Sequence, residues 1–150
     1  MKSNVQYLWC VFNWERVAVS CPEIQEGHPM KFMLIVHHNE DAFKKMDKET
    51  QSQLLTESIE LTHQLHATGQ YVHASPLQPA ATAVNVRVRE GKPLVTDGPF
   101  IETREQIAGY FLIQAQNLRE AIGIAGKVPG ARIGPVEVRP LIEITGLPNE

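Results

Sequence analysis

The sequence predicts one α+β domain in which the segments run βαββαβ, with an extra β-hairpin inserted after the second strand. Near-continuous apolar runs at 32–36 and 108–115 are typical of strands covered on both faces, and helical spacing of apolar residues follows each run. Valine alternates with polar residues at 82–89, as in a strand with one buried face. At 150 residues, one such domain can bury a core without disulfides or metal ions.

The first half of the core is expected to run strand, helix, strand. After the strand at 32–36, a first helix is predicted over 48–68, and Gly69 ends it in the left-handed conformation. A second strand is predicted at 71–75, where Pro76 interrupts it. The core-facing side of the helix is expected to carry Leu54, Ser58, Leu61, Thr62 and Leu65.

The inserted hairpin is predicted from residues 82–89 and 93–96, joined by a turn at 90–92. The first of its strands should be half-buried, because its two faces differ in polarity. One face carries Val84, Val86 and Val88, and the other carries Asn85, Arg87 and Arg89.

Residues 97–100, Asp-Gly-Pro-Phe, are predicted to form a sharp turn after the hairpin. Gly98 precedes Pro99 and is therefore kept out of the right-handed helical region, and the Asp97 carboxylate can fold back onto nearby N–H groups. Such a turn either stabilises the fold or holds a carboxylate at a site. Residues 103–106 have capping-box spacing for one short helical turn.

The second half of the core is expected to run strand, helix, strand. Asn117 and Glu120 have the spacing of a helix cap, and the helix should end near 128–130. A last strand alternates over 136–144, with Pro140 marking an edge or a bulge. The helix is expected to bury Leu118, Ala121, Ile122 and Ala125.

The remaining segments lie outside this pattern. Residues 1–29 form an N-terminal extension without a sustained period, and residues 147–150 form a tail after a domain at 30–146. Two interpretations of the extension stay open: it packs on the domain as an extra element, or Met30 is the natural first residue.

Composition excludes several classes of protein. The formal net charge is −3 and no cluster of Lys or Arg exceeds two neighbours, so nucleic acid is not an expected partner. No apolar run is long enough to cross a membrane. Cys10 and Cys21 match no metal or redox spacing, which favours a reduced, cytoplasmic protein.

The turn and the residues after it resemble the signature of the YCII-related family, in its DGPF branch. The matching positions are 97–100, Glu102, Arg104-Glu105 and Gly109-Tyr110, with Arg104 where the family usually has lysine. The resemblance extends over residues 30–140 and implies a ferredoxin-like fold with an antiparallel sheet that pairs as a dimeric α/β barrel. The chemistry of the family is largely unassigned.

The candidate site residues surround this turn. Asp97 and His73 are the candidate catalytic pair, because a carboxylate beside a histidine supports acid–base chemistry near neutral pH. In the alternative reading, Asp97 only caps the turn and Arg104 pairs with a neighbouring glutamate. His37 and His38 point to opposite sides of one strand and cannot share a site. The candidate ligand-binding residues are His37, His38, Glu102, Arg104 and Tyr110.

No metal or other cofactor is expected. His63 and His66 have the spacing of a helical metal pair, but no third ligand accompanies them. Phosphate-binding loops, nucleophile elbows and dinucleotide fingerprints are absent from the sequence.

Two functions follow as hypotheses. One is an acid–base enzyme, an isomerase, lyase or hydrolase acting on a small polar metabolite in the barrel cleft. The other is a non-catalytic module that binds a small molecule or a protein partner, as family members linked to sigma-factor regulation would suit. A homodimer is expected in either case, because both helices should cover one face of the sheet and leave the other apolar, unless residues 1–29 cover it.

Overall fold

The computed structural model describes residues 29–101 and 103–144. The predictions on residues 1–28, on Glu102 and on the tail at 147–150 lie outside the described residues. The chain divides into two compact units, and the fold described below is that of the unit formed by residues 25–141.

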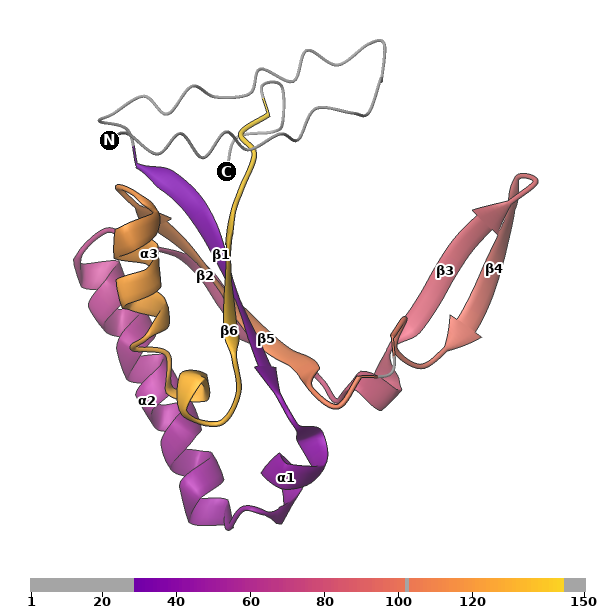
Figure 1. Cartoon of the computed structure of the whole chain (residues 1–150), viewed down its shortest axis with the longest axis horizontal. Helices are drawn as coiled ribbons and strands as arrows, with labels where there is room; N and C mark the ends of the chain where they lie inside the picture. The colour runs from indigo at the N-terminus through magenta and orange to yellow at the C-terminus, as the bar shows by residue number, and fades with distance from the viewer. Residues whose placement is uncertain (1–28, 102, 145–150) are drawn as a thin grey trace, which may run out of the picture. The chain divides into compact units, whose positions relative to one another are not determined.

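Four strands form one antiparallel sheet in the order β2-β5-β1-β6 (Figure 1). These strands are β1 (Met30–His38), β2 (Tyr71–Pro76), β5 (Gln106–Ala115) and β6 (Val136–Pro140). The longest two, β1 and β5, are the central pair, as their near-continuous apolar runs predicted. The α+β class, the βαββαβ order and the ferredoxin-like sheet are thereby confirmed.

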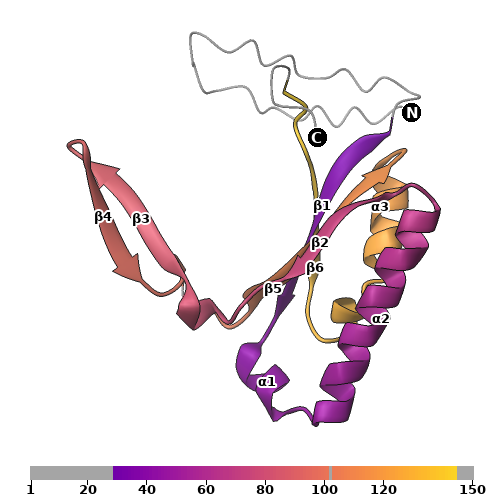
Figure 2. The ribbon, with the colours of Figure 1, turned by 180° about the vertical axis from the view of Figure 1, so that it is seen from behind.

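Helices α2 (Lys48–Ala67) and α3 (Leu118–Ala125) cover the same face of the sheet, as the two opposite views show (Figures 1 and 2). Asn117 caps α3 as predicted, because its side-chain oxygen accepts from the Glu120 N–H at 3.0 Å. Asp47 caps α2 by accepting from the Thr50 N–H at 2.7 Å.

A short helix that was not predicted, α1 (Glu40–Lys45), lies between β1 and α2. Asn39 caps it by accepting from the Ala42 N–H at 2.9 Å. Acidic residues in its first turn and lysines in its last turn suit the helix dipole. These local signals were present in the sequence. The helix predicted over 48–68 is confirmed as α2, which runs from Lys48 to Ala67.

The core lies between the sheet and the two long helices. Leu61 and Leu65 of α2 are buried as predicted, but α3 buries Ala121, Ile124 and Ala125. Leu118 and Ile122 are 48% and 55% exposed, so their predicted burial was wrong. The small side chains of Ala121 and Ala125 let the helix approach the sheet, and this turns the buried stripe toward Ile124. The other buried core residues are Phe32, Leu34, Val36, Phe111, Ile113, Ala115 and Val128.

The last strand is shorter than predicted. β6 ends at Pro140, an edge-strand position where the missing N–H costs no ladder hydrogen bond. Leu141 makes one more contact with β1 through a 2.9 Å bond to the Lys31 carbonyl. Ile142 and Ile144 are exposed beyond the strand, so the extension to residue 144 was wrong.

The second face of the sheet is covered by no helix of the described residues. Because side chains alternate along each strand, this open face carries the residues between the core positions. It is mixed in character: Met33, Ile35 and Leu112 lie near the centre, and polar side chains come from both the central and the edge strands. The polar side chains include His37, His73, Tyr110, Glu137 and Arg139.

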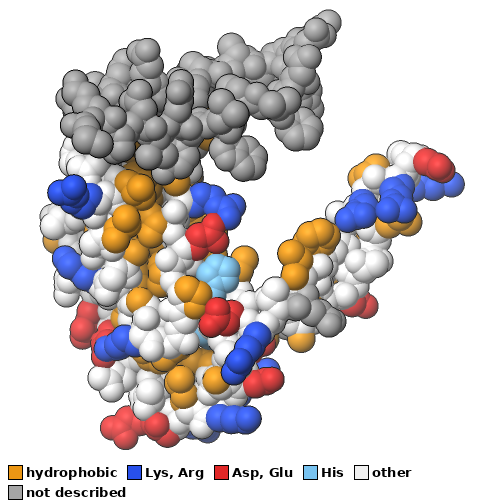
Figure 3. Space-filling model, in the orientation of Figure 1, with side chains coloured by type: hydrophobic (Ala, Val, Ile, Leu, Met, Phe, Trp, Pro, Cys, Tyr) orange, Lys and Arg blue, Asp and Glu red, His pale blue; other side chains and the backbone are white. Residues whose placement is uncertain are grey.

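The inserted hairpin pairs β3 (Val84–Arg89) with β4 (Lys92–Asp97) as a separate two-stranded sheet. Glu90 and Gly91 both have positive φ, at 50° and 74°, which suits a tight hairpin turn. The expectation of a half-buried strand was wrong, because Val84, Val86 and Val88 are all exposed. Apolar and basic side chains are both visible along the hairpin (Figure 3).

The Asp-Gly-Pro-Phe turn closes the base of the hairpin. Gly98 adopts φ 92° as expected, its N–H donates to the Ala83 carbonyl at 2.8 Å, and the Asn85 side chain donates to its carbonyl. Residues 104 and 105 form bends and β5 starts at Gln106, so the predicted helical turn over 103–106 was wrong. Thr103 and Gln106 instead bond backbone carbonyls of this loop through their side chains.

Candidate functional site

His37 and His38, neighbours on β1, lie on opposite faces of the sheet and line different cavities. This confirms the inference from strand alternation that they cannot share a site. His38 faces the helices together with the core residues, whereas His37 lies on the open face. Each histidine therefore defines a separate candidate site.

The first site is an apolar cavity of about 310 Å³ between α2 and the strands β2 and β5. Its volume lies in the range of small-molecule sites. Aliphatic residues of α2, including Leu54 and Ile59, form one wall, and residues 74–76 and 108–111 form the other. The remaining lining residues are Val36, His38, Phe43, Leu55, Ser58, Thr62, Tyr71, Val128, Gly130 and Ile133.

His38 is the half-buried titratable group on the wall of this cavity. Its ring stacks on Phe43 of α1, with 4.6 Å between the ring centroids and 13° between the planes. Burial lowers the pKa of His38 below its ordinary value, and the nearby Glu40 carboxylate offsets part of that decrease. The ring is therefore neutral at physiological pH and can accept a proton.

Glu40 is held in place by two contacts. One carboxylate oxygen accepts from the Ala80 N–H at 2.6 Å, and the other lies 3.7 Å from the Lys44 ammonium. Ala80 begins the 3-10 turn (Ala80–Thr82) that leads into the hairpin. Through Glu40, the loop before the hairpin is thus connected to the wall that carries His38.

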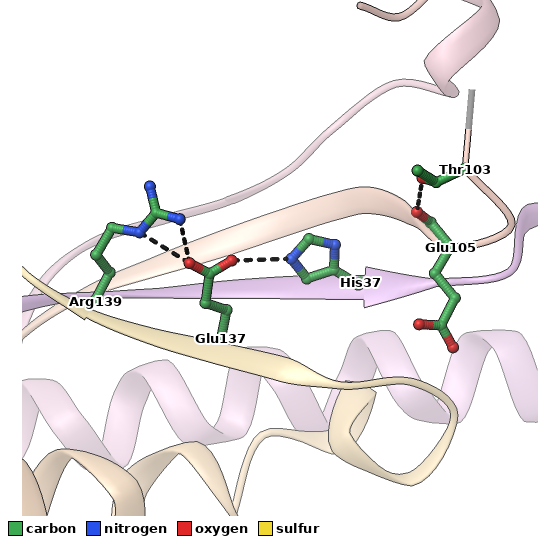
Figure 4. A network of polar contacts seen from close by, with 5 residues as sticks. All are labelled: His37, Thr103, Glu105, Glu137 and Arg139. Carbon is green, nitrogen blue, oxygen red and sulfur yellow. Dashed lines mark hydrogen bonds and ion pairs between the residues drawn. The ribbon is translucent and has the colours of Figure 1, made fainter. Parts of the chain in front are cut away.

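The second site is a more open hollow of about 620 Å³ at one end of β1 and β6. The Nε2 atom of His37 lies 3.6 Å from a Glu137 oxygen, and Arg139 binds the other oxygen of Glu137 through two nitrogens (Figure 4). The loop at 103–105, which includes Arg104, lines the same hollow. The loop that precedes β5 therefore shares this hollow with His37 and Glu137.

His73 and Tyr110 pair with each other on the open face. The Tyr110 hydroxyl and the His73 Nδ1 are 3.0 Å apart, and the two rings stack with centroids separated by 5.7 Å. Sequence reasoning had placed both near Asp97. The bonds of the described residues connect His73 to Tyr110 rather than to a carboxylate.

Asp97 lies at the end of β4 and lines a groove of the hairpin with Asn85, Arg87, Pro99 and other hairpin residues. Among the described residues, its carboxylate makes no hydrogen bond or ion pair. The predicted cap on the turn is thus not formed with them. Glu102, its expected neighbour, lies outside the described residues.

Sequence reasoning missed the partners of the two β1 histidines. Glu137 is one member of an alternating strand and Phe43 belongs to the missed helix, so neither carried a recognisable motif. The cap at Asn39 could have predicted α1 and brought Phe43 and Glu40 close to His38.

The described part of the chain arranges no group of three or more His, Cys, Asp or Glu side chains around a common point suited to a metal ion. Nor does it contain a helix long and apolar enough to cross a membrane.

The strand order and the helix-covered sheet define a ferredoxin-like α+β domain. The chain belongs to the YCII-related domain family, whose profile matches residues 30–145. It is also similar to an uncharacterized protein of Rhizobium meliloti (strain 1021), with 29% identity over 114 residues that cover 75% of this chain and 92% of that protein. Neither match assigns a substrate, so function has to be argued from the site itself.

Proposed function

We propose that the cavity beside His38 is a small-molecule site and that the protein is an acid–base enzyme of the isomerase, lyase or hydrolase type. The observation that carries this is a neutral, half-buried histidine on the wall of an apolar cavity. A perturbed histidine on the wall of an apolar cavity has the properties of a general base.

In this proposal a free nitrogen of the His38 ring takes a proton from an acidic C–H, O–H or N–H bond of the ligand. The ring becomes an imidazolium, and the Glu40 carboxylate stabilises that charge from nearby. Stacking on Phe43 fixes the plane of the ring. The protonated ring then returns the proton to the ligand or to a leaving group.

This proposal places the carboxylate and histidine roles on Glu40 and His38 rather than on Asp97 and His73. The expected chemistry is unchanged, since a carboxylate still lies near a histidine. A catalytic role for Asp97 and His73 stays a prediction without a supporting contact among the described residues.

A thermal-shift screen of small molecules, followed by NMR observation of any bound compound over time, tests the proposal. Compounds that act at the cavity should raise the melting temperature of the wild type and lose turnover in His38→Gln. His63→Gln, on the exposed side of α2, is the matched control and should behave as the wild type. Turnover that survives His38→Gln but is lost in His37→Gln would move the site to the opposite face.

The expected homodimer belongs to the same proposal. No helix of the described residues covers the open face, where Met33, Ile35 and Leu112 lie between polar edges. A second copy is the simplest cover for such a face. Sedimentation that shows only monomer at micromolar concentration would contradict it.

A non-catalytic partner module is the second candidate, and the exposed valines of the hairpin favour it. An isolated two-stranded hairpin is marginal in water, so a partner that packs on Val86 and Val95 would stabilise it. A link to sigma-factor regulation is a finer form of this idea. Retained ligand turnover after both valines are changed to threonine would favour the enzyme over the module.

A further inference from the structure

Charged side chains are absent from the described residues that line the His38 cavity. Glu40 acts on His38 but does not line the cavity itself. While the His38 ring is neutral, an ion that enters this apolar site loses its hydration and gains no opposite charge. The cavity is therefore unsuited to a carboxylate, a phosphate or an ammonium group.

The serine and threonine hydroxyls of α2 that line the cavity already donate their protons to backbone carbonyls. Ser58 donates to the Leu54 carbonyl at 2.7 Å, and Thr62 donates to the Ile59 carbonyl at 2.6 Å. Both of these oxygens can still accept a hydrogen bond, but neither has a proton left to donate.

Two groups that line the cavity can either donate or accept a hydrogen bond. A neutral His38 ring has one donor and one acceptor nitrogen, and the Tyr71 hydroxyl can donate or accept. Together with the engaged hydroxyls of Ser58 and Thr62, the polar groups of the cavity contain more acceptors than donors. A ligand that brings donors leaves fewer of these groups unsatisfied than one that brings only acceptors.

From these two observations we infer the class of ligand: an uncharged, largely apolar molecule with at least one O–H or N–H donor, such as an alcohol, a phenol or a primary amide. The inference rests on the proposed function, because it takes the cavity as the ligand site. It also replaces the polar metabolite expected from the sequence with a mainly apolar one, since apolar residues form most of the wall.

Four probes that share one ring test the inference by NMR titration of the full chain: benzyl alcohol, toluene, benzoate and benzylammonium. Benzyl alcohol should bind at least about tenfold more tightly than benzoate and benzylammonium, and more tightly than toluene. Tighter binding of either ion than of benzyl alcohol would contradict the inference that the cavity selects uncharged ligands. Equal binding of toluene and benzyl alcohol would overturn the need for a donor.

Variants of α2 show whether the probes enter the cavity. Ser58→Leu fills the cavity and should abolish binding, whereas Ser52→Leu makes the same change at an exposed position of the same helix and should not. Thr62→Leu serves as a second filled variant if Ser58→Leu does not fold.

Failure of all four probes to bind the wild type would overturn the cavity as a ligand site, and with it the proposed function. Binding of an ion that both filled variants abolish would overturn only the ligand class.

Discussion

The central strand β5 and the hairpin strand β3 have opposite burial, although both are typical β sequences. In β5, Phe111, Ile113 and Ala115 are buried under the helices and alternate with half-buried neighbours. In β3, Val86 is 64% exposed and its cross-strand partner Val95 is 62% exposed. The strand pattern predicts both segments correctly, but it does not say which strand has a second layer over it.

The difference shows where the stability of this domain comes from. The central sheet has four strands and one face packed by α2 and α3, so its apolar side chains leave water on folding. The hairpin has only its own ladder and its tight turn. Its apolar face gains little from folding unless another surface covers it.

Truncation of one apolar side chain in each region should give the largest contrast. Leu34→Ala removes a side chain with no exposed area and should lower the free energy of unfolding by about 3 kcal/mol. Val86→Ala should change it by less than about 0.5 kcal/mol, because the side chain is exposed. Urea denaturation measures both.

Protein concentration sharpens this comparison. A loss of stability in Val86→Ala that shrinks as the protein is diluted would show that a second copy covers the hairpin in solution. A loss as large as that of Leu34→Ala at every concentration would contradict the division into two regions.

A glycine substitution in each region should separate packing from backbone strain. A Cβ at Gly109 of β5 would lie 2.8 Å from the Ser75 carbonyl oxygen and 3.0 Å from Pro76 Cα, so Gly109→Ala should cost about 2 kcal/mol as β2 and β5 move apart. At Gly98 the space is open and only the positive φ opposes a side chain. Gly98→Ala should cost about 1 kcal/mol.

The two glycine variants also differ in what they should do to binding. Gly109 lines the His38 cavity, so probe binding should weaken in Gly109→Ala and stay unchanged in Gly98→Ala. Weaker binding in Gly98→Ala alone would place the ligand near the hairpin instead.

The helix caps allow a smaller and more local test. Asn117→Ala should lower stability by about 1 kcal/mol, since the Glu120 N–H loses its acceptor. Asn117→Asp keeps an acceptor and should retain most of that stability. Equal losses in both variants would show that the cap contributes little and that α3 is held by Ala121 and Ala125 alone.

Sequence patterns predicted most of this fold because the main elements carry local signals. The apolar runs of β1 and β5, the cap at Asn117 and the turn at Gly98 all depend on a few adjacent residues. The exposure of Val86 and the burial of Ile124 depend on what packs opposite them, which a local pattern does not contain. The same limit explains why Leu118 was expected in the core.

The candidate site was harder to predict than the fold. His37, His38, Tyr110 and Arg104 were all selected from the sequence, and the structure places each beside a cavity or a polar partner. Their partners Phe43 and Glu137 were missed because the pairs form across separate elements. The proposed importance of Asp97 followed from a turn motif, and a turn can be strongly specified by Gly98 and Pro99 without its aspartate making a bond.

The smallest expected effect concerns the pH dependence of stability. Burial lowers the pKa of His38 in the folded protein, whereas the unfolded chain has the ordinary value near 6.5. As pH falls through that value, the unfolded state takes up a proton that the folded state resists, so stability decreases toward acid and is restored above it. His38→Gln should remove this part of the dependence in urea denaturation measured between about pH 5 and 8, and His63→Gln should leave it in place.

Glu40→Gln should lower the pKa of His38 further in an NMR titration, because the carboxylate that favours the imidazolium is gone. An unchanged His38 titration in Glu40→Gln would mean that Glu40 cannot stabilise the protonated ring, and the proposed catalytic pair would then lose its carboxylate.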